Sequence, residues 1–518
     1  MILRLQKFFI DKTYLILNVI LALAAFLRLY RISDYMNFLG DEGRDVLTVK
    51  HILEGQITLL GPRSSAADFY YGPIYFYVIT PFLWLFNYDP VGPAVFIALL
   101  GILTVLLVFI VGKKWFSTGT ALIAAALYAV SPIVITYSHS SWNPNPLPFV
   151  SLLVLYLCYL SFTKPVFWKY LLIGLLLGIA IQLQYLALFL IAIVFIYLFV
   201  GSIVATKRLN ILSLISQYVL IVVGFLAGWS PFLAFEFHHG FPNLNTIFRF
   251  LTGQIPSNTV VVSSPFAQVS EVFFKLFGRL VTAYPLTNLT QIHTTQTLYF
   301  WYVITLVVAI ASVIAVIFIK DKLAKTALIV WLVVGVALFA FYKKEIYDYY
   351  LGFMFPLPFF LVGNLIQKSY NATKQKIVQG LLIILVTYLF IHNLSFVPLR
   401  YTPNKIRDQV KTIAEMVIAH TDNKPYNFAL ITGGNSDHAY RYYLEVLGHK
   451  PVEMQNQFTD PERKTVTDQL MVVCEDLSCG PLGYPVFEVS GFGRAEITGE
   501  WDGPHVKIFR LVHYTGKE

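Results

Sequence analysis

Residues 170–205 read YLLIGLLLGIAIQLQYLALFLIAIVFIYLFVGSIVA, a run without one charged side chain. As a single helix this run would be roughly 54 Å long, whereas the hydrocarbon core of a bilayer is about 30 Å thick. Basic residues flank the run on both sides, within 164–169 and at 207–208. Because such residues gather on the cytoplasmic side of a membrane, the run is predicted to cross twice, with its turn at the polar stretch 182–185.

The composition of the whole chain agrees with a membrane protein. Of its 518 residues, 57% are hydrophobic and only 13% are charged, and the mean hydropathy is +0.65. A soluble protein of this length cannot bury so much apolar surface. The net charge of +9 is carried by short loops between apolar runs, so it does not indicate a nucleic-acid partner. Three cysteines provide no metal or redox framework.

The apolar runs predict an α-helical polytopic membrane protein with about eleven spans. Lysines and arginines in the N-terminus and in alternate loops place the N-terminus in the cytoplasm and the C-terminus outside. The first run lacks a small-residue cleavage site, so we expect it to be retained. The predicted spans are 14–30, 92–112, 119–138, 147–163, two within 170–205, 211–235, 298–319, 325–341, 350–367 and 377–397.

Segment 72–88 is apolar enough to be a further span, but the distribution of charge argues against a crossing. The N-terminus and the loop at Lys113-Lys114 both carry the basic residues of cytoplasmic segments. Spans 14–30 and 92–112 already supply the two crossings between them. Segment 72–88 is therefore predicted to be an interfacial helix within a long first external loop, residues 31–91.

The C-terminal part differs in pattern from the rest of the chain. Helical spacing of apolar residues from 406 to 417 is followed by strand-like and helical stretches that are typical of a small α/β fold. The chain is therefore divided into a membrane domain, 1–397, and an extracytoplasmic α/β domain, 398–518. Two cysteines of this domain, Cys474 and Cys479, could form a disulfide in an oxidising compartment or stay reduced. The expected strands are 428–431, 470–473 and 506–512, and the second expected helix is 439–446.

Carboxylates follow the first span in the stretch Gly40-Asp41-Glu42-Gly43-Arg44-Asp45. One interpretation is a helix start, because acidic side chains favour the positive end of a helix dipole and apolar residues follow at helical spacing up to Gly55. The other is an active-site base at the lipid–water boundary. The two interpretations are compatible.

Other polar residues are predicted to lie on the same external side. Each has an ordinary explanation, as a solvated loop charge, a helix cap or an interfacial aromatic residue. Taken together, an acid and several cations beside a bilayer suit a phosphate-bearing lipid substrate. These residues are Asp45, Arg63, His139, Asn143, Gln184, Tyr185, Lys343, Lys344 and Tyr347.

Residues 1–200 resemble the C-type, multi-spanning glycosyltransferases, among them the protein O-mannosyltransferases and the lipid A aminoarabinose transferases. The resemblance is carried by Asp41-Glu42 after the first span, by Tyr71-Gly72-Pro73-Ile74-Tyr75-Phe76, and by the span that ends in Lys113-Lys114-Trp115-Phe116. The stretch Ser131-Pro132 to Ser138 continues it, and Tyr347-Asp348-Tyr349-Tyr350 adds a weaker match. The C-terminal domain lies outside it.

The resemblance implies a cell-envelope enzyme that moves a sugar from a polyprenyl-phosphate carrier to an acceptor hydroxyl on the extracytoplasmic face, with inversion. It implies that Asp41 is the general base, with Glu42 beside it in the catalytic stretch. Relatives often carry an acidic residue in the second loop, where this chain has Asn143 and Asn145. We therefore expect no metal, since neutral amides alone bind divalent cations poorly.

Several alternatives remain open at this point. The enzyme could be a ligase that moves a larger lipid-linked glycan, and the acceptor could be a glycan, a lipid or a protein. A non-catalytic membrane receptor or a transporter belongs to a different class. A transporter should place ionisable residues at mid-membrane, and the predicted span interiors are nearly free of charge.

Overall fold

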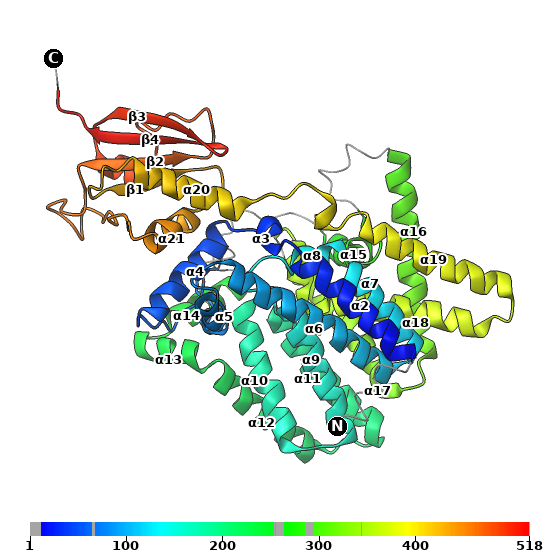
Figure 1. Ribbon diagram of the computed structural model, residues 1–518. Helices are drawn as coiled ribbons and strands as arrows, with labels where there is room; N and C mark the ends of the chain where they lie inside the picture. The colour runs from blue at the N-terminus through cyan, green and yellow to red at the C-terminus, as the bar shows by residue number, and fades with distance from the viewer. Residues whose placement is uncertain are drawn as a thin grey trace.

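The structure is a computed structural model, which describes residues 12–64, 68–252, 254, 264–284, 295–342 and 344–516. Long helices make up most of it, and a small sheet packed with helices stands at one end (Figure 1). We call the described residues between Lys12 and Leu394, helices and connecting loops together, the membrane body. We call residues 406–513 the α/β region. The helical fold with a C-terminal α/β region confirms the predicted fold class.

The helices of the membrane body match the predicted spans closely. Its spanning candidates are α2 (Lys12–Leu29), α6 (Val91–Trp115), α7 (Thr118–Val130), α9 (Leu147–Thr163), α10 (Phe167–Leu183), α11 (Ala187–Thr206), α12 (Ile211–Gly228), α16 (Thr295–Ile314), α17 (Lys322–Ala337), α18 (Pro356–Ala372) and α19 (Lys376–Leu394). The shorter elements are α3 (Ile32–Tyr35), α4 (Gly40–Leu53), α5 (Ile74–Leu85), α8 (Pro132–Thr136), α13 (Ser230–His239), α14 (Pro242–Leu251), α15 (Pro265–Gly278), η2 (Ala315–Phe318), η3 (Leu338–Phe341), η4 (Asp348–Met354) and η5 (Pro398–Arg400).

Within the described residues, seven helices are long and apolar enough to cross a membrane, or eight if the bent pair η4 and α18 is one span. Three shorter apolar helices, α7, α9 and α10, coincide with the remaining predicted spans. The fourth shorter one, α5, is the helix predicted to be interfacial. The helices thus exist where the hydropathy places them, while the count of eleven crossings stays a prediction.

Helices α10 and α12 show how the spans pack. Gly174 and Gly178 of α10 face Gly224 and Gly228 of α12, each pair spaced four apart. A Cβ at Gly174 would lie 2.0 Å from the carbonyl oxygen of Ile221. Small residues at this spacing let two helix backbones approach closely where lipid offers no hydrophobic driving force. The run quoted first therefore folds as two helices, which end at 183 and begin at 187 as predicted.

The α/β region contains a four-stranded sheet of order β1-β2-β4-β3. Strands β1 (Asn427–Ile431) and β2 (Gln469–Cys474) pair in parallel, and β4 (Val506–His513) pairs antiparallel with both β2 and β3 (Ala495–Gly503). The helices are α20 (Ile406–Ala419), α21 (His438–Val446) and the short α22 (Phe487–Phe492). The predicted elements are present, and β3 is the strand that the sequence pattern missed.

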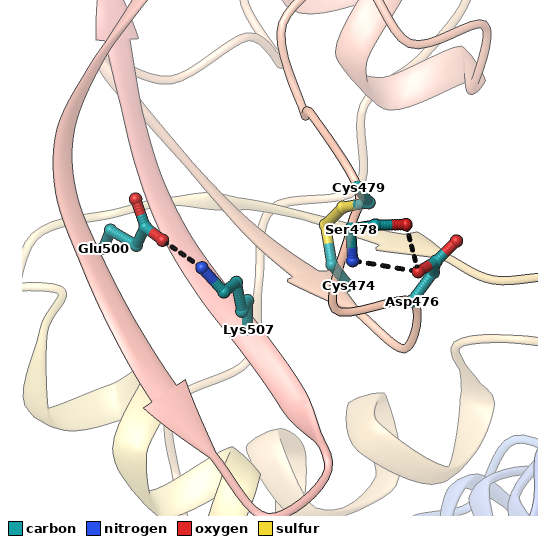
Figure 2. The surroundings of a disulfide bond; sticks show 6 residues. All are labelled: Cys474, Asp476, Ser478, Cys479, Glu500 and Lys507. Carbon is teal, nitrogen blue, oxygen red and sulfur yellow. Dashed lines mark hydrogen bonds and ion pairs between the residues drawn. A yellow bond between two sulfur atoms is a disulfide. The ribbon is translucent and has the colours of Figure 1, made fainter.

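A disulfide joins Cys474, the last residue of β2, to Cys479 (Figure 2). It closes the short loop that follows the strand, in which Asp476 accepts hydrogen bonds from the backbone and hydroxyl of Ser478. The bond resolves the alternative that the sequence left open. The loop also carries Glu475, which faces a cavity described below.

The α/β region is anchored to the membrane body at several separate points. His51 of α4 lies 2.9 Å from Glu445 of α21, and Arg407 of α20 pairs with Asp89 before α6. The phenol of Tyr442 donates to a backbone carbonyl of that same turn before α6. The contacts between α21 and α4 lie beside the candidate site.

Candidate active site

Helix α4 begins at Gly40, as the helix interpretation of the stretch predicted. Asp41 and Glu42 lie in its first turn, where carboxylates favour the helix dipole. Glu42 reaches back to accept a hydrogen bond from the backbone N–H of Leu39 at 3.2 Å, which satisfies a donor at the helix start. Gly55, at φ 95°, follows the end of the helix. The same residues therefore serve both interpretations.

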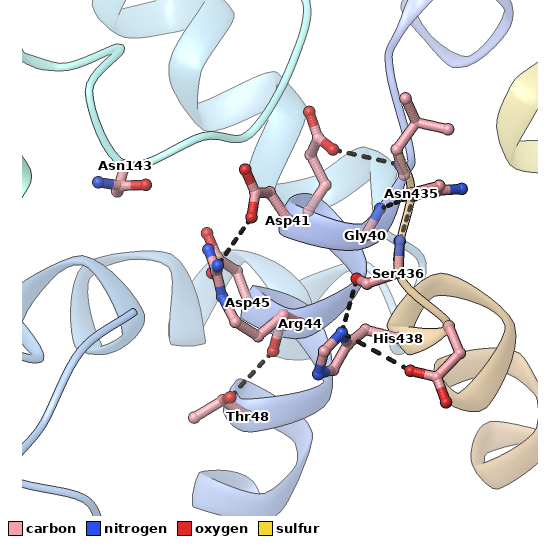
Figure 3. A network of polar contacts seen from close by, with 12 residues as sticks. Gly40, Asp41, Arg44, Asp45, Thr48, Asn143, Asn435, Ser436 and His438 are labelled. Carbon is pink, nitrogen blue, oxygen red and sulfur yellow. Dashed lines mark hydrogen bonds and ion pairs between the residues drawn. The ribbon is translucent and has the colours of Figure 1, made fainter. Parts of the chain in front are cut away.

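The start of α4 touches the α/β region directly. The backbone N–H of Gly40 donates to Asn435 Oδ1 at 2.9 Å (Figure 3). A Cβ on Gly40 would lie 2.1 Å from Ser436 Oγ, and one on Gly43 would lie 2.3 Å from the backbone nitrogen of Ala439. The two glycines therefore permit a backbone approach that no larger residue allows.

Arg44 bridges two carboxylates of α4. Its Nη1 lies 2.7 Å from Asp41 Oδ1, and its Nη2 lies 2.7 Å from Asp45 Oδ1 (Figure 3). The Asp41 side chain is 54% exposed, whereas that of Asp45 is fully buried. Burial raises the pKa of Asp45 to about 6, against the opposing effect of Arg44. The buried Asp45 therefore holds the Arg44 guanidinium in place, and Arg44 in turn orients the carboxylate of Asp41.

Glu42 has a different environment from Asp41. Its side chain is buried, and this burial raises its pKa to about 7. A carboxyl group that titrates near neutrality is suited to proton transfer. Glu42 is thus a second candidate for acid–base work, on the same helical turn.

A small cavity of about 60 Å³ lies on one side of Asp41. Its lining combines cationic, amide and phenol groups, which are the donors that bind phosphate oxygens. The tip of the α10–α11 hairpin closes it, because Asn143 donates to the Leu183 carbonyl at 2.6 Å and Tyr71 donates to Gln184 Oε1 at 3.2 Å. The lining residues are Asp41, Arg44, Pro62, Arg63, Tyr71, Trp142, Asn143, Pro144, Gln184, Tyr185, Tyr349 and Tyr350.

A large cavity of about 830 Å³ lies on the other side of Asp41, between the membrane body and the α/β region. Asp41 and Glu42 both line it, together with Trp142 and residues of the α/β region. Asp41 and Trp142 are thus shared between the two cavities. The carboxylate of Asp41 lies at the boundary between them.

The small cavity brings together five of the predicted residues: Asp41, Arg63, Asn143, Gln184 and Tyr185. The phenol of Tyr185 is 2.7 Å from that of Tyr342. Arg63 pairs with Asp68 at 2.9 Å and stays largely exposed. The sequence reasoning omitted Tyr71 and Tyr350 from the site, although both stand in stretches that it quoted.

Other predicted residues lie outside both cavities. His139 is buried, with Nε2 2.9 Å from the Leu27 carbonyl oxygen, and burial lowers its pKa to about 4. Its imidazole is therefore neutral, which corrects its expected part as a cation. Lys344 lies over the Phe250 ring, and Tyr347 donates to Glu345 at 2.9 Å. Lys343 lies outside the described residues.

The candidate site does not have the ligand set of a divalent metal. Over the described parts of the chain, no three His, Cys, Asp or Glu side chains gather in a group that could hold one. Asn143, at the second-loop position where relatives often carry an acid, uses its amide nitrogen to fix the loop. The absence of a metal requirement stays a prediction.

Comparisons with known proteins agree with this geometry. Residues 71–235 match a family model described as dolichyl-phosphate-mannose-protein mannosyltransferase. The chain shares its fold with ArnT from Cupriavidus metallidurans bound to undecaprenyl phosphate, at 13% identity and a TM-score of 0.64, over 95% of this chain and 97% of that one. No curated protein matches it in sequence.

A second solved structure is the archaeal oligosaccharyltransferase AglB from Archaeoglobus fulgidus, in complex with an inhibitory peptide and a dolichol-phosphate. It is 11% identical, with a TM-score of 0.53, over 89% of this chain and 69% of that one. The family match and the shared fold confirm the predicted resemblance. Residues 71–235 thus match a membrane mannosyltransferase family model, and the chain shares the fold of two solved membrane glycosyltransferases.

Proposed function

We propose that the protein transfers a sugar from a polyprenyl monophosphate to an acceptor hydroxyl on the extracytoplasmic face, with inversion and with Asp41 as general base. The N-terminus would be cytoplasmic, and residues 398–518 would form an extracytoplasmic domain. The observation that carries the proposal is the position of Asp41, which lines both cavities. A base at this boundary can face an acceptor on one side and the anomeric carbon on the other.

The small cavity suits the donor phosphate. Arg44 and Arg63 supply positive charge, and the phenols of Tyr71, Tyr185 and Tyr350 supply hydrogen-bond donors. Such groups stabilise the charge that develops on a departing phosphate. The solved relatives support this assignment, because ArnT holds undecaprenyl phosphate and AglB holds a dolichol-phosphate.

The proposed reaction is a single displacement. Asp41 takes the proton of the acceptor hydroxyl while its oxygen forms a bond to the anomeric carbon. The bond from that carbon to the phosphate oxygen breaks, and its electron pair leaves with the polyprenyl phosphate. One displacement needs one base and no protein nucleophile, so inversion at the anomeric carbon follows.

Replacement of the proposed base tests this mechanism. Asp41→Asn keeps the shape of the side chain and removes its basicity, so transfer from a polyprenyl-phosphate sugar should fall by about 10²–10⁴. The matched control is Glu54→Gln at the far end of the same helix, where Glu54 pairs with Lys50. Transfer is measured as labelled sugar leaving the lipid fraction of membranes that contain equal amounts of folded protein.

Two outcomes would contradict the assignment. Near-normal transfer by Asp41→Asn together with an inactive Glu42→Gln variant would move the role of base to Glu42. An unchanged anomeric configuration in the product would exclude the single displacement.

A further inference from the structure

The large cavity is built from two parts of the chain that are far apart in sequence. Its floor is the start of α4 and the second loop of the membrane body, and its roof is the α/β region. A volume of about 830 Å³ lies within the range of small-molecule sites. The roof residues are Ile406, Gln409, Val410, Ile413, Thr432, Gly434, Asn435, Ser436, Tyr440, Glu475, Pro504, His505 and Val506.

The charges in the large cavity are carboxylates. Asp41 and Glu42 come from its floor and Glu475 from its roof, and none of the described residues that line it is Lys or Arg. Cations near the roof are directed to other partners: Arg407 pairs with Asp89, and Arg441 pairs with Asp437. Arg44 pairs with Asp41 from the small-cavity side and does not line the large cavity. A phosphate or carboxylate group in the large cavity would therefore meet carboxylates on two sides, with no lysine or arginine among the described lining residues to bind it.

The turn after β1 offers no anion site either. Thr432 Oγ1 accepts hydrogen bonds from the backbone N–H groups of Gly434 and Asn435. Asn435 Oδ1 accepts from the N–H groups of Gly40 and Ser436. The backbone N–H groups of Gly434, Asn435 and Ser436 are therefore already engaged. Glu475 accepts from the amide of Asn435 at 2.8 Å, so a carboxylate lies beside the turn.

Aromatic rings supply the rest of the recognition surface. Tyr137 and Trp142 stand in the floor and Tyr440 in the roof. An aromatic face packs against apolar C–H groups, while carboxylate and amide oxygens accept hydrogen bonds from hydroxyl groups. A sugar presents both kinds of group on one small ring. The combination of rings and acceptors therefore suits a carbohydrate.

The sheet contributes its strand ends to the cavity. Thr432 and Glu475 follow the carboxyl ends of the parallel strands β1 and β2, where α/β sheets commonly bind ligands. The hairpin between β3 and β4 adds Pro504 and His505. Only residues at the ends of strands line the cavity, and not the edge of a whole strand. The cavity therefore lacks the exposed strand backbone with which an extended peptide forms hydrogen bonds.

We propose that the large cavity is the acceptor site and that it takes a neutral, hydroxyl-rich acceptor, a carbohydrate, in preference to a phosphate-bearing or acidic one. This inference rests on the proposed function, since it names the acceptor that Asp41 would deprotonate. The α/β region then selects the acceptor, while the membrane body holds the donor.

Binding and transfer are measured separately to test the inference. The purified full-length protein is applied to an array of neutral oligosaccharides, the same oligosaccharides carrying a phosphate, and serine- and threonine-containing peptides. Binding to the neutral oligosaccharides is expected, with at least tenfold weaker binding of their phosphorylated forms. Trp142→Ala should abolish this binding, whereas Trp84→Ala, which removes a tryptophan exposed on α5, should leave it unchanged.

A matched pair of charge variants sharpens the test. Gln409 is a half-buried roof residue of α20 whose amide donates to the Asn404 carbonyl. Gln409→Lys should strengthen binding of the phosphorylated oligosaccharides by about tenfold, and the isosteric Gln409→Glu should weaken it further. Binding of the neutral forms is the reference for each variant, because a neutral oligosaccharide carries no charge for the added side chain to attract or repel.

The outcomes separate this inference from the proposed function. If phosphorylated oligosaccharides or peptides bind and receive the sugar while neutral glycans do not, the transferase stands and the carbohydrate acceptor is wrong. If neutral glycans bind but no probe receives sugar from a polyprenyl-phosphate donor, the glycan site stands and the proposed function falls. Absence of binding to all three sets overturns the inference.

Discussion

The two cavities beside Asp41 differ in both charge and origin. The small cavity has arginines and tyrosine phenols and comes entirely from the membrane body. The large cavity has carboxylates and aromatic rings, and more than half of its lining residues come from the α/β region. The difference teaches that one helical turn can border two cavities of unlike chemistry, because a different part of the chain completes each cavity.

The contact between α4 and α21 should be the most sensitive part of this arrangement. Gly43→Val would bring a side chain against the backbone of Ala439, where even a Cβ has only 2.3 Å. The α/β region would have to move, and a displacement of about 1 Å near the chemistry costs of order 100-fold in rate. Transfer should fall by that factor in an assay with saturating donor.

The control for this variant is Gly380→Val in α19, because a Cβ at Gly380 meets nothing within 4 Å. Equal loss of transfer in both variants would mean that a general helix effect, and not the contact with α21, is responsible. Retained donor binding in Gly43→Val would show that the small cavity keeps its structure when the α/β region is displaced.

Glu42, which lines only the large cavity, should make the stability of the protein depend on pH. Its pKa in the folded protein is about 7, above the ordinary value of 4.5, so the folded state binds more protons than the unfolded state between these values. Stability should therefore fall as pH rises from about 4.5 to 7, by roughly 3 kcal/mol at most. Above pH 7 this contribution should be constant.

Thermal unfolding of the purified protein between pH 5 and pH 8 measures this effect. Glu42→Gln, which cannot ionise, should give a flatter profile across the same window. A parent profile that is equally flat would show that Glu42 stays ionised when folded. Its assigned role on the large-cavity side would then need revision.

The disulfide offers a smaller perturbation on the same side. Replacement of Cys474 and Cys479 together by serine should cost about 2 kcal/mol of stability, as expected for a short closed loop. The loop carries Glu475, so the apparent affinity for acceptor should weaken while donor affinity stays unchanged. Alkylation mass spectrometry with and without reductant checks the bond. An equal change in the affinities for donor and acceptor would contradict the assignment of the two cavities to different substrates.

Removal of divalent metal ions should change the rate of sugar transfer less than any of the changes above. The small cavity provides cations from Arg44 and Arg63, and the described residues contain no metal-ligating group of three. Transfer should therefore remain within about twofold in EDTA. Activity lost in EDTA and restored by magnesium or manganese would contradict this.

Local patterns in the sequence were sufficient for much of the fold. Hydropathy and breaks in the apolar runs predicted the helices of the membrane body. The length of the run 170–205, its basic flanks and its polar stretch predicted the turn at 182–185. Strand β3 was missed because it is an edge strand whose polar, glycine-containing sequence is interrupted by an irregularity between Ile497 and Gly499. Edge strands of this kind lack the alternating apolar pattern on which prediction depends.

The candidate site was predicted only in part, for a different reason. Asp41 and the residues of the small cavity lie in loops that the predicted topology brings to one side. The contact of Gly40 and Gly43 with residues 436–439 joins positions almost 400 residues apart, and no local pattern reports such a contact. The large cavity, and the part of Glu42 in it, could therefore be seen only in three dimensions.

Gly40 and Gly43 also limit how segments of this chain can be exchanged with those of other proteins. The contact between α4 and α21 depends on residues of the first loop, Gly40 and Gly43, as well as on residues 436–439 of the C-terminal part. A chimaera that exchanges only residues 398–518 with those of a relative would meet a helix shaped for a different neighbour. An exchange that is meant to keep this contact therefore has to carry the stretch around 40–43 along with the α/β region.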